Sequence, residues 1–547
     1  MKKFFFLMVS FCLMIYACSS QKKNDLTPKV TIADGVLQGI KDSTTGVYAF
    51  LGIPFAKPPI GELRWKAPQL VDHWKGVRKA DHFGPRPMQP AVFSDMHFRS
   101  DSMSEDCLYL NVWTPTTGDA KSLPVLVYFY GGGFMAGSSD EPRYDGASLA
   151  KKGMVVVTAN YRLNVFGFLA LPELSAEAPY KASGNYGLLD QNAALKWVHQ
   201  NIAAFGGDPN KVTIGGESAG SISVSEQMAS PLSKGLIAGA IGESGAAFNP
   251  TMAPVSLSDA EKAGVTFARQ IGHASLKELR ALPAQQLLDL YVKSKYFNFP
   301  VCIDGYFLPK PMSAIYESKE QAQVPLLVGW NSAEMPAVAL MGGKSFTPQN
   351  FTAQVKAAFP QHYNEVLKAF PHANATEVER SATDLASDRF IVYSTWKWFD
   401  LQRNNSTQKV YRYLFDNARP PLRHSISSAG QAGGAVKQPT PQPPMPQPIG
   451  AAHSQEIEYC LGNLYLTPWY AWRKQDYAVS DTMENYFANF IKTGNPNGKD
   501  LPEWPAAAPA IANPFVMWIK THSQAVPATN DQRFDVLSKI FDQSSAQ

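Results

Sequence analysis

Cysteine is scarce in this chain, and the five that occur lie far apart. No two of them have the C-x-x-C spacing typical of zinc or redox sites, so both kinds of site are disfavoured. Their low number also excludes a scaffold held together by disulfides. We expect Cys107, Cys302 and Cys460 to be buried free thiols. The five are Cys12, Cys18, Cys107, Cys302 and Cys460.

Long runs of one charge are also missing. The net charge is only +4, and no basic run is long enough for a nucleic-acid-binding surface, so we expect no nucleic-acid partner. Hydrophobic residues make up 45% of the 547 residues, which is ample for a large core. Length alone would suggest several domains, but no shift in composition divides the chain. We therefore predict a single domain over residues 29–547.

The first 28 residues differ from the rest. Lys2 and Lys3 precede an apolar run too short to span a bilayer comfortably, which predicts a signal peptide over residues 1–17. The residues around Cys18 are similar to a bacterial lipoprotein box, which implies cleavage before Cys18 and lipidation of its sulfur. Simple secretion is the alternative. Residues 18–28 would form a flexible tether, so we expect an exported protein of the bacterial envelope (periplasm or outer membrane) that meets a membrane only through this anchor.

Apolar runs alternate with helical patterns along the rest of the chain. This order predicts an α/β fold with a large, mostly parallel sheet, helices on both faces and long insertions. Residues 419–449 are dense in Pro, Gln and Gly, which predicts a low-complexity loop. Strands are expected near residues 30–40, 123–130, 154–160, 236–244, 324–330 and 410–415, and helices near residues 187–204, 260–271, 384–400, 481–492 and 531–542.

Residues 216–220, Gly-Glu-Ser-Ala-Gly, are the strongest chemical signal. They follow a short β-branched run and precede a helical pattern, which is typical of a nucleophile elbow. On such a tight turn the positions two before and two after the serine must be small. The hydroxyl of Ser218 is therefore the candidate nucleophile. An ordinary glycine-rich turn is the alternative interpretation.

A glycine run upstream supplies candidate donors for an oxyanion. Residues 131–133 follow a buried strand, and glycines let backbone N–H groups approach a substrate oxygen closely. Such runs occur before the nucleophile in lipases and esterases. We assign the N–H groups of Gly132 and Gly133 as donors, with that of Ala219 as a third. No G-K-[ST] follows, so a phosphate-binding loop is disfavoured.

A base and an acid complete the chemistry that a serine nucleophile needs. His453 lies among small residues that leave room for an imidazole on a loop above the sheet, although spacing alone favours a solvated loop histidine. His424 is a rival in surroundings that look unstructured. Glu334 follows the strand predicted at residues 324–330, where parallel sheets place ligands and catalysis. A carboxylate at a helix start is the alternative for Glu334.

These motifs together resemble the type-B carboxylesterase family, the cholinesterase-like branch of the α/β hydrolases. The resemblance runs over nearly the whole mature length. It implies Ser218 as nucleophile, Glu334 as acid and His453 as base, with no metal and no cofactor. Besides the elbow, the matching stretches are residues 52–56, 105–111, 130–134, 160–162, 187–191, 205–209 and 504–505.

The resemblance also implies supporting residues. Ser244 stands in a similar Gly-Glu-Ser-Gly stretch but lacks a glycine two positions later, so it is not expected as a nucleophile. The resemblance implies that it is a buried hydroxyl near Glu334. Side chains around the triad would include Glu217, Ser244 and Glu456, and structural ion pairs would join Arg64 to Glu105 and Arg162 to Asp190.

Departures from the family pattern limit what carries over. The family often pairs the cysteine at position 107 with one upstream after a Gly-Pro, but residues 84–88 contain none, so we predict that Cys107 is unpaired. Met335 replaces the usual glycine after Glu334. The loop at residues 88–103 has no tryptophan for a quaternary ammonium, so a choline substrate is not supported.

The predicted function is hydrolysis of small-molecule carboxylic esters through an acyl-enzyme. A non-catalytic adhesion or binding protein on the same fold is the alternative from another class. An amidase, thioesterase or lactonase is the alternative among enzymes, because the same site handles each. The sequence indicates neither the acyl and alcohol groups nor the oligomeric state.

Overall fold

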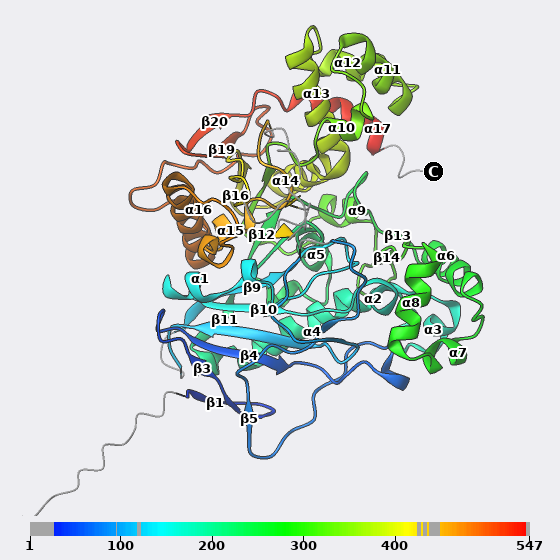
Figure 1. Cartoon of the computed structure of the whole chain (residues 1–547), viewed down its shortest axis with the longest axis vertical. Coiled ribbons are helices and arrows are strands. Elements are labelled where there is room, and N and C mark those ends of the chain that lie inside the picture. Colours follow the sequence, from blue (N-terminus) through cyan, green and yellow to red (C-terminus); the bar gives the residue numbers. More distant parts are fainter. Residues whose placement is uncertain are drawn as a thin grey trace, which may run out of the picture.

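The centre of the molecule is an 11-stranded mixed sheet (Figure 1). The computed structural model describes residues 27–93, 96–117, 122–423, 428–429, 435–436 and 449–542. The strands from β19 to β10 run parallel, and antiparallel strands flank them at both edges. In spatial order the strands are β20 (Gln524–Pro527), β19 (Phe515–Ile519), β16 (Val410–Phe415), β15 (Leu326–Asn331), β12 (Gly239–Glu243), β11 (Gly207–Glu217), β9 (Leu123–Phe129), β10 (Val155–Ala159), β8 (Tyr109–Thr114), β4 (Tyr48–Pro54) and β3 (Ile40–Lys41).

The middle of the sheet is buried on both faces. Every residue of β10, β12 and β15 is buried, although successive side chains point to opposite sides of a strand. Helices must therefore cover both faces, as the sequence predicts for a parallel sheet. The helices in contact with the central strands are α1 (Ala147–Lys151), α4 (Tyr186–Asn201), α5 (Ala219–Ala229), α14 (Tyr393–Asn405) and α16 (Lys474–Thr493).

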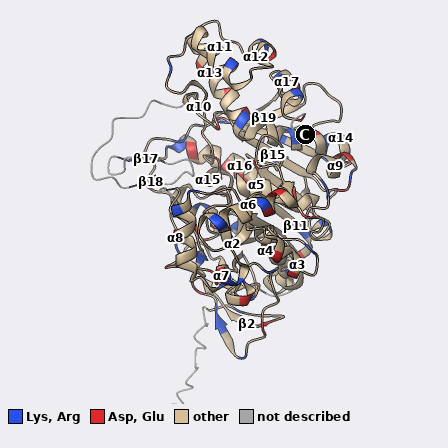
Figure 2. Cartoon of the chain, turned by 90° about the vertical axis from the view of Figure 1, so that its right-hand side faces the viewer, with Lys and Arg blue, Asp and Glu red and all other residues tan. Residues whose placement is uncertain are grey.

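Two further groups of helices lie at the edges of the molecule in Figure 1. On the face shown in Figure 2, basic and acidic residues are interspersed along the helices. Within the described residues, none of the helices has the length and apolar character needed to cross a bilayer. The group at the right of Figure 1 comprises α6 (Leu257–Gln270), α7 (Leu276–Ala281) and α8 (Ala284–Ser294), and the group at the top comprises α10 (Val338–Met341), α11 (Pro348–Ala358), α12 (Tyr363–Ala369), α13 (Ala375–Ser387) and α17 (Gln532–Phe541).

The α/β architecture expected from the sequence is confirmed, and two element predictions are wrong. Residues 30–40 form two strands, β1 (Lys29–Ile32) and β2 (Gly35–Gln38), because the chain turns back at Asp34 and Gly35, whose φ is 150°. The single helix expected at residues 384–400 is instead α13 and α14, joined by a π turn.

Some sequence predictions fall on parts of the chain outside the described residues. The signal peptide, Cys18, His424 and most of the loop at residues 419–449 are among them, and within that loop the structure describes the short strands β17 (Ser428–Ala429) and β18 (Ala435–Val436). The three remaining cysteines are buried free thiols, as predicted: Cys107, Cys302 and Cys460.

Backbone packing around the turn from β11 to α5 explains its glycines. A Cβ added at Gly216 would lie 2.6 Å from the carbonyl carbon of Gly220, and one added at Gly220 would overlap the carbonyl oxygen of Phe129. Neither clash can be relieved by turning a side chain, because the atoms concerned are backbone. The parallel pair of β11 and β9 and the start of α5 are thus packed too closely for any residue but glycine.

We predict that Gly220→Ala lowers the free energy of unfolding by about 3 kcal/mol or more, because the added methyl group must push β9 and α5 apart. Gly215→Ala is the matched control, since the nearest atoms to its Cβ would all belong to side chains, at 3.3 Å (Leu126), 3.4 Å (Tyr128) and 3.7 Å (Ile241). Urea unfolding of both variants measures the difference. Equal midpoints for the two variants would show that the close packing at Gly220 is not a constraint.

Candidate active site

Ser218 occupies a strained turn at the end of the central strand. β11 ends at Glu217 and α5 begins at Ala219, so Ser218 alone joins strand to helix. Its φ of 55° and ψ of −122° are rare for a residue with a side chain, and such a conformation costs about 1–3 kcal/mol. The N–H of Ser218 donates to the carbonyl of Glu243 on the neighbouring strand at 2.9 Å. The turn is therefore held against β12, at the carboxyl end of the parallel strands.

The structure brings Ser218, His453 and Glu334 together. His453 lies 235 residues after Ser218 and 119 residues after Glu334 in the sequence. His453 Nε2 lies 2.9 Å from Ser218 Oγ, and His453 Nδ1 lies 2.6 Å from Glu334 Oε2. A carboxylate can only accept, so Nδ1 carries the proton and donates it to Glu334. In the neutral imidazole, Nε2 is then free to accept the hydrogen bond of the Ser218 hydroxyl.

The loops that carry the histidine and the glutamate are tied to each other. The hydroxyl of Ser332 accepts from the N–H of Ala451, and the N–H of Ala333 donates to the carbonyl of Ala451 at 2.8 Å. The side-chain amide of Asn331 donates to the carbonyl of Ala452, also at 2.8 Å. These bonds explain why small residues precede His453: a larger side chain would separate the two loops.

The second oxygen of Glu334 meets two further donors. Glu334 Oε1 accepts from the N–H of Asn331 at 2.6 Å and from the hydroxyl of Ser244 at 2.5 Å. Ser244 thus lies where the resemblance predicts, and it also donates to Glu456 Oε1 at 3.2 Å. Asn331 was missed from the sequence. Its position directly after the strand, three residues before Glu334, is the signal that could have found it.

Two more buried carboxyl groups lie near the imidazole. Glu217 Oε1 is 3.3 Å from His453 Nε2, and Glu456 accepts from the Asn331 amide at 2.5 Å. Burial raises the pKa of Glu217 to about 7 and raises that of Glu456 well above its usual range. Burial alone would lower the pKa of His453, but the charges of Glu217 and Glu334 outweigh it and raise that pKa to about 9.

The glycine run passes directly beside the nucleophile. A Cβ on Gly131 would lie 3.0 Å from the Cβ of Ser218. Gly132 and Gly133 have φ values of 116° and 63°, which favour glycine. In the described part of the chain, neither of their N–H groups donates to another group of the protein. Ala219 is the first residue of α5, so its N–H belongs to the helix end that directly follows Ser218.

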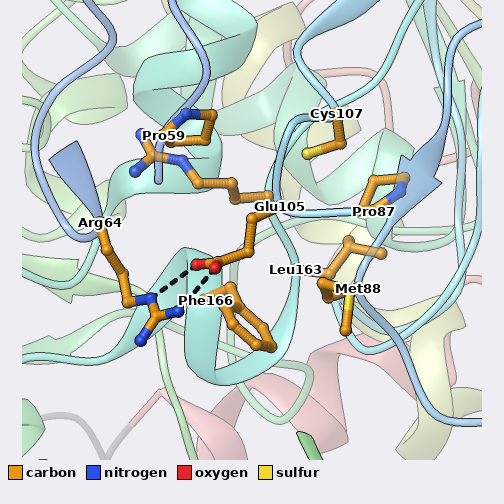
Figure 3. Close-up of a pocket in the computed structure, with 9 residues that line it drawn as sticks. Pro59, Arg64, Pro87, Met88, Glu105, Cys107, Leu163 and Phe166 are labelled. Atoms are coloured by element: carbon orange, nitrogen blue, oxygen red, sulfur yellow. Dashed lines mark hydrogen bonds and ion pairs between the residues drawn. The ribbon is translucent and has the colours of Figure 1, made fainter. Parts of the chain in front are cut away.

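Two buried ion pairs support the chain around the site. Arg64 binds Glu105 through two hydrogen bonds of 2.6 Å (Figure 3). Its remaining N–H groups donate to carbonyls that include that of Leu282, so it joins three segments. Arg162 binds Asp190 through hydrogen bonds of 2.8 Å and 2.7 Å. Both pairs are shielded from water, in keeping with a structural role.

The departures from the family pattern have local consequences. Cys107, a free thiol, and Pro87 line one small cavity with the Arg64–Glu105 pair (Figure 3). The N–H of Met335 donates to the hydroxyl of Ser387 at 3.0 Å, and that hydroxyl reaches the carbonyl of Met335 at 3.3 Å. The backbone after Glu334 is thus held by a side chain from the end of α13.

The comparisons with known proteins agree with this site. Residues 26–536 match the family described as the carboxylesterase family. An acylcarnitine hydrolase of Mus musculus is 32% identical over an alignment that covers 90% of this chain and 88% of that protein. A fumonisin B1 esterase of Sphingopyxis macrogoltabida is 34% identical, covering 79% of this chain and 74% of that protein.

A solved structure extends the similarity to the fold. The crystal structure of a carboxylesterase from Geobacillus stearothermophilus superposes with a TM-score of 0.76 at 29% identity, covering 93% of this chain and 99% of that one. Sequence, fold and the chemistry of the site therefore point the same way. The chain belongs to the carboxylesterase family and is a carboxylic ester hydrolase with the α/β-hydrolase fold.

Proposed function

We propose that Ser218, His453 and Glu334 are the catalytic triad of this esterase, and that the N–H groups of Gly132, Gly133 and Ala219 bind the oxyanion. The observation that carries the proposal is the continuous chain of hydrogen bonds from Glu334 through His453 to Ser218, with lengths of 2.6 Å and 2.9 Å. Such a series of hydrogen bonds orients the imidazole so that Nε2 can take the proton of the serine hydroxyl.

The reaction proceeds in two steps. His453 Nε2 takes the proton of Ser218 as Oγ attacks the ester carbonyl, and the glycine N–H groups stabilise the tetrahedral oxyanion. His453 then gives that proton to the leaving alcohol, and an acyl group remains on Ser218. Water attacks the acyl-enzyme by the same route, which releases the acid and restores the hydroxyl. Glu334 accepts the hydrogen bond of Nδ1 and stabilises the charged imidazole.

The substrate is a small-molecule carboxylic ester. The relatives above are named for chemically different esters, so their names support the reaction class and no single substrate for this chain. An amide or a thioester could enter the same two steps. A panel of nitrophenyl esters, feruloyl-type esters, amides and thioesters separates these substrates by kcat/KM.

We expect Ser218→Ala to lower kcat for a nitrophenyl ester by roughly 10⁵–10⁶-fold, because no other group then forms the acyl-enzyme. Ser230→Ala, at the far end of α5, is the matched control and should keep the parental rate. Circular dichroism establishes that both variants are folded. Substantial turnover by folded Ser218→Ala protein would refute the assignment of the nucleophile.

The pH dependence should reflect the carboxylates around His453. Only the neutral imidazole can accept a proton, so activity is lost as the pH falls below the pKa of His453. Because neighbouring carboxylates raise that pKa to about 9, the acid limb of kcat/KM should lie above the usual 6.5 of histidine. Glu217→Gln removes one of these charges and should move the limb to lower pH, by about one unit or more.

The matched control for the pH profile is Glu226→Gln. Glu226 is fully buried on α5, neither of its carboxyl oxygens has a hydrogen-bond partner among the described residues, and burial raises its pKa well above the usual range. The charges that raise the pKa of His453 are instead those of Glu217, Glu334 and Glu456. Replacement of Glu226 should leave the acid limb in place. If both Glu217→Gln and Glu226→Gln keep the acid limb of the parental protein, Glu217 does not set the pKa of the base.

We also propose that the protein is exported and held at the bacterial envelope by a lipid on Cys18. The basic start, short apolar run and small residues before Cys18 support this, and all lie outside the described residues. Cells expressing the full chain should incorporate labelled palmitate into it, and Cys18→Ser should abolish the label. Label retained on Cys18→Ser protein, or a parental protein that is unlabelled and released, would contradict the anchor.

A further inference from the structure

One π turn interrupts the long helical stretch from α13 to α14. It spans Asp388–Val392, and each helix on either side is regular. A π turn adds a residue to the helical repeat and weakens its hydrogen bonds, so such turns are rare and are often found at functional sites. The question is which side chain this turn presents, and to what.

Contacts at its start and at its middle hold the π turn in place. Asp388 is fully buried and binds Arg533 through hydrogen bonds of 2.8 Å and 3.2 Å. The hydroxyl of Thr251 donates to the carbonyl of Phe390 at 2.6 Å, which satisfies an acceptor inside the turn. The preceding residue, Ser387, binds the backbone of Met335. The turn is therefore anchored beside the loop that carries Glu334.

The ring of Phe390 meets the imidazole of His453. Their centroids are 5.0 Å apart and their planes cross at 80°, an edge-to-face contact. Both nitrogens of the imidazole already face Glu334 and Ser218, so Phe390 packs against its carbon surface. Phe390 is only partly buried, unlike Ile391 and Val392, which follow it. Phe390 therefore keeps some accessible surface while its ring contacts the imidazole of the base.

The proposed reaction geometry brings part of the ester substrate close to the ring of Phe390. His453 Nε2 must reach both Ser218 Oγ and the oxygen of the leaving alcohol, so the ester lies within hydrogen-bond distance of the imidazole. A substituent that extends from the ester toward the imidazole then meets the ring of Phe390. The ring limits how large that substituent can be.

We propose that Phe390 is a specificity-determining residue, presented by the π turn as the wall against which the ester substituent nearest His453 packs. This inference rests on the proposed triad. It assigns a substrate contact to a residue that lies 63 positions before His453 and that no motif of the chain singles out.

The test compares substrate selectivity in two variants and one control. Phe390→Ala opens the wall and Phe390→Trp thickens it, whereas Arg389→Ala changes an exposed neighbour on the same turn that lies over the ring of Phe359. Each protein is assayed with nitrophenyl esters of increasingly branched acids and with acetates of increasingly branched alcohols. For each series, kcat and KM are measured separately.

In one of the two series, Phe390→Ala should raise kcat/KM for the branched ester relative to the smallest ester by about tenfold, since removing a ring frees space for several methylene groups. Phe390→Trp should shift the same ratio the other way, and Arg389→Ala should leave it unchanged. A residue with a purely structural role would lower all rates together and leave the ratio alone.

Ratios that stay at the parental value in both series for both Phe390 variants would overturn the inference, as would an equal shift in Arg389→Ala. A nitrophenol burst equal to the enzyme concentration distinguishes this failure from failure of the triad. If the kcat/KM ratios are unchanged and the nitrophenol burst equals the enzyme concentration, only the proposed role of Phe390 is refuted. Turnover that survives in Ser218→Ala removes the triad and this inference with it.

Discussion

The hydrogen bond between His453 Nδ1 and Glu334 Oε2 is the contact on which the site depends. It joins two loops that are distant in the sequence and fixes which nitrogen of the imidazole carries the proton. Neither loop has regular structure of its own at this point. Their position comes from bonds between them, through Asn331, Ser332 and Ala451, so the base and the acid are placed as one unit.

That unit lies in an environment rich in carboxyl groups. Glu217 and Glu456 are buried near the imidazole, and burial raises the pKa of both. Glu334 Oε1 accepts from a backbone N–H and from the hydroxyl of Ser244, while Glu334 Oε2 accepts from the imidazole. These hydrogen bonds hold the Glu334 carboxylate in place, so it orients the base. Glu217 and Glu334 together raise the pKa of His453 and so set the pH at which the base loses its proton.

The sequence predicted the parts of this site that are decided locally. The elbow and the glycine run are readable because the backbone leaves no room for a side chain, and the same shortage of space appears at Gly216 and Gly220. His453 is different: its spacing alone favours a solvated loop histidine, and only the family resemblance selects it as the base. No local rule indicates that Ala451 and Ser332 bring its loop to Glu334.

Other features left no readable signal. The π turn has the same apolar spacing as an ordinary helix over its few residues, so a single helix was expected there and Phe390 went unnoticed. The N-terminal pair of strands was read as one because both alternate with a period of two, and the turn at Gly35 shifts that alternation without ending it. In each case the outcome depends on contacts with distant parts of the chain.

Covalent trapping tests the central claim most directly. The full-length protein is treated with a fluorophosphonate ester, digested and mapped by mass spectrometry. The account predicts one phosphonyl group per chain, on Ser218, formed in parallel with the loss of esterase activity, and much slower labelling of His453→Ala. A label on another residue, or loss of activity without any label on Ser218, would contradict it.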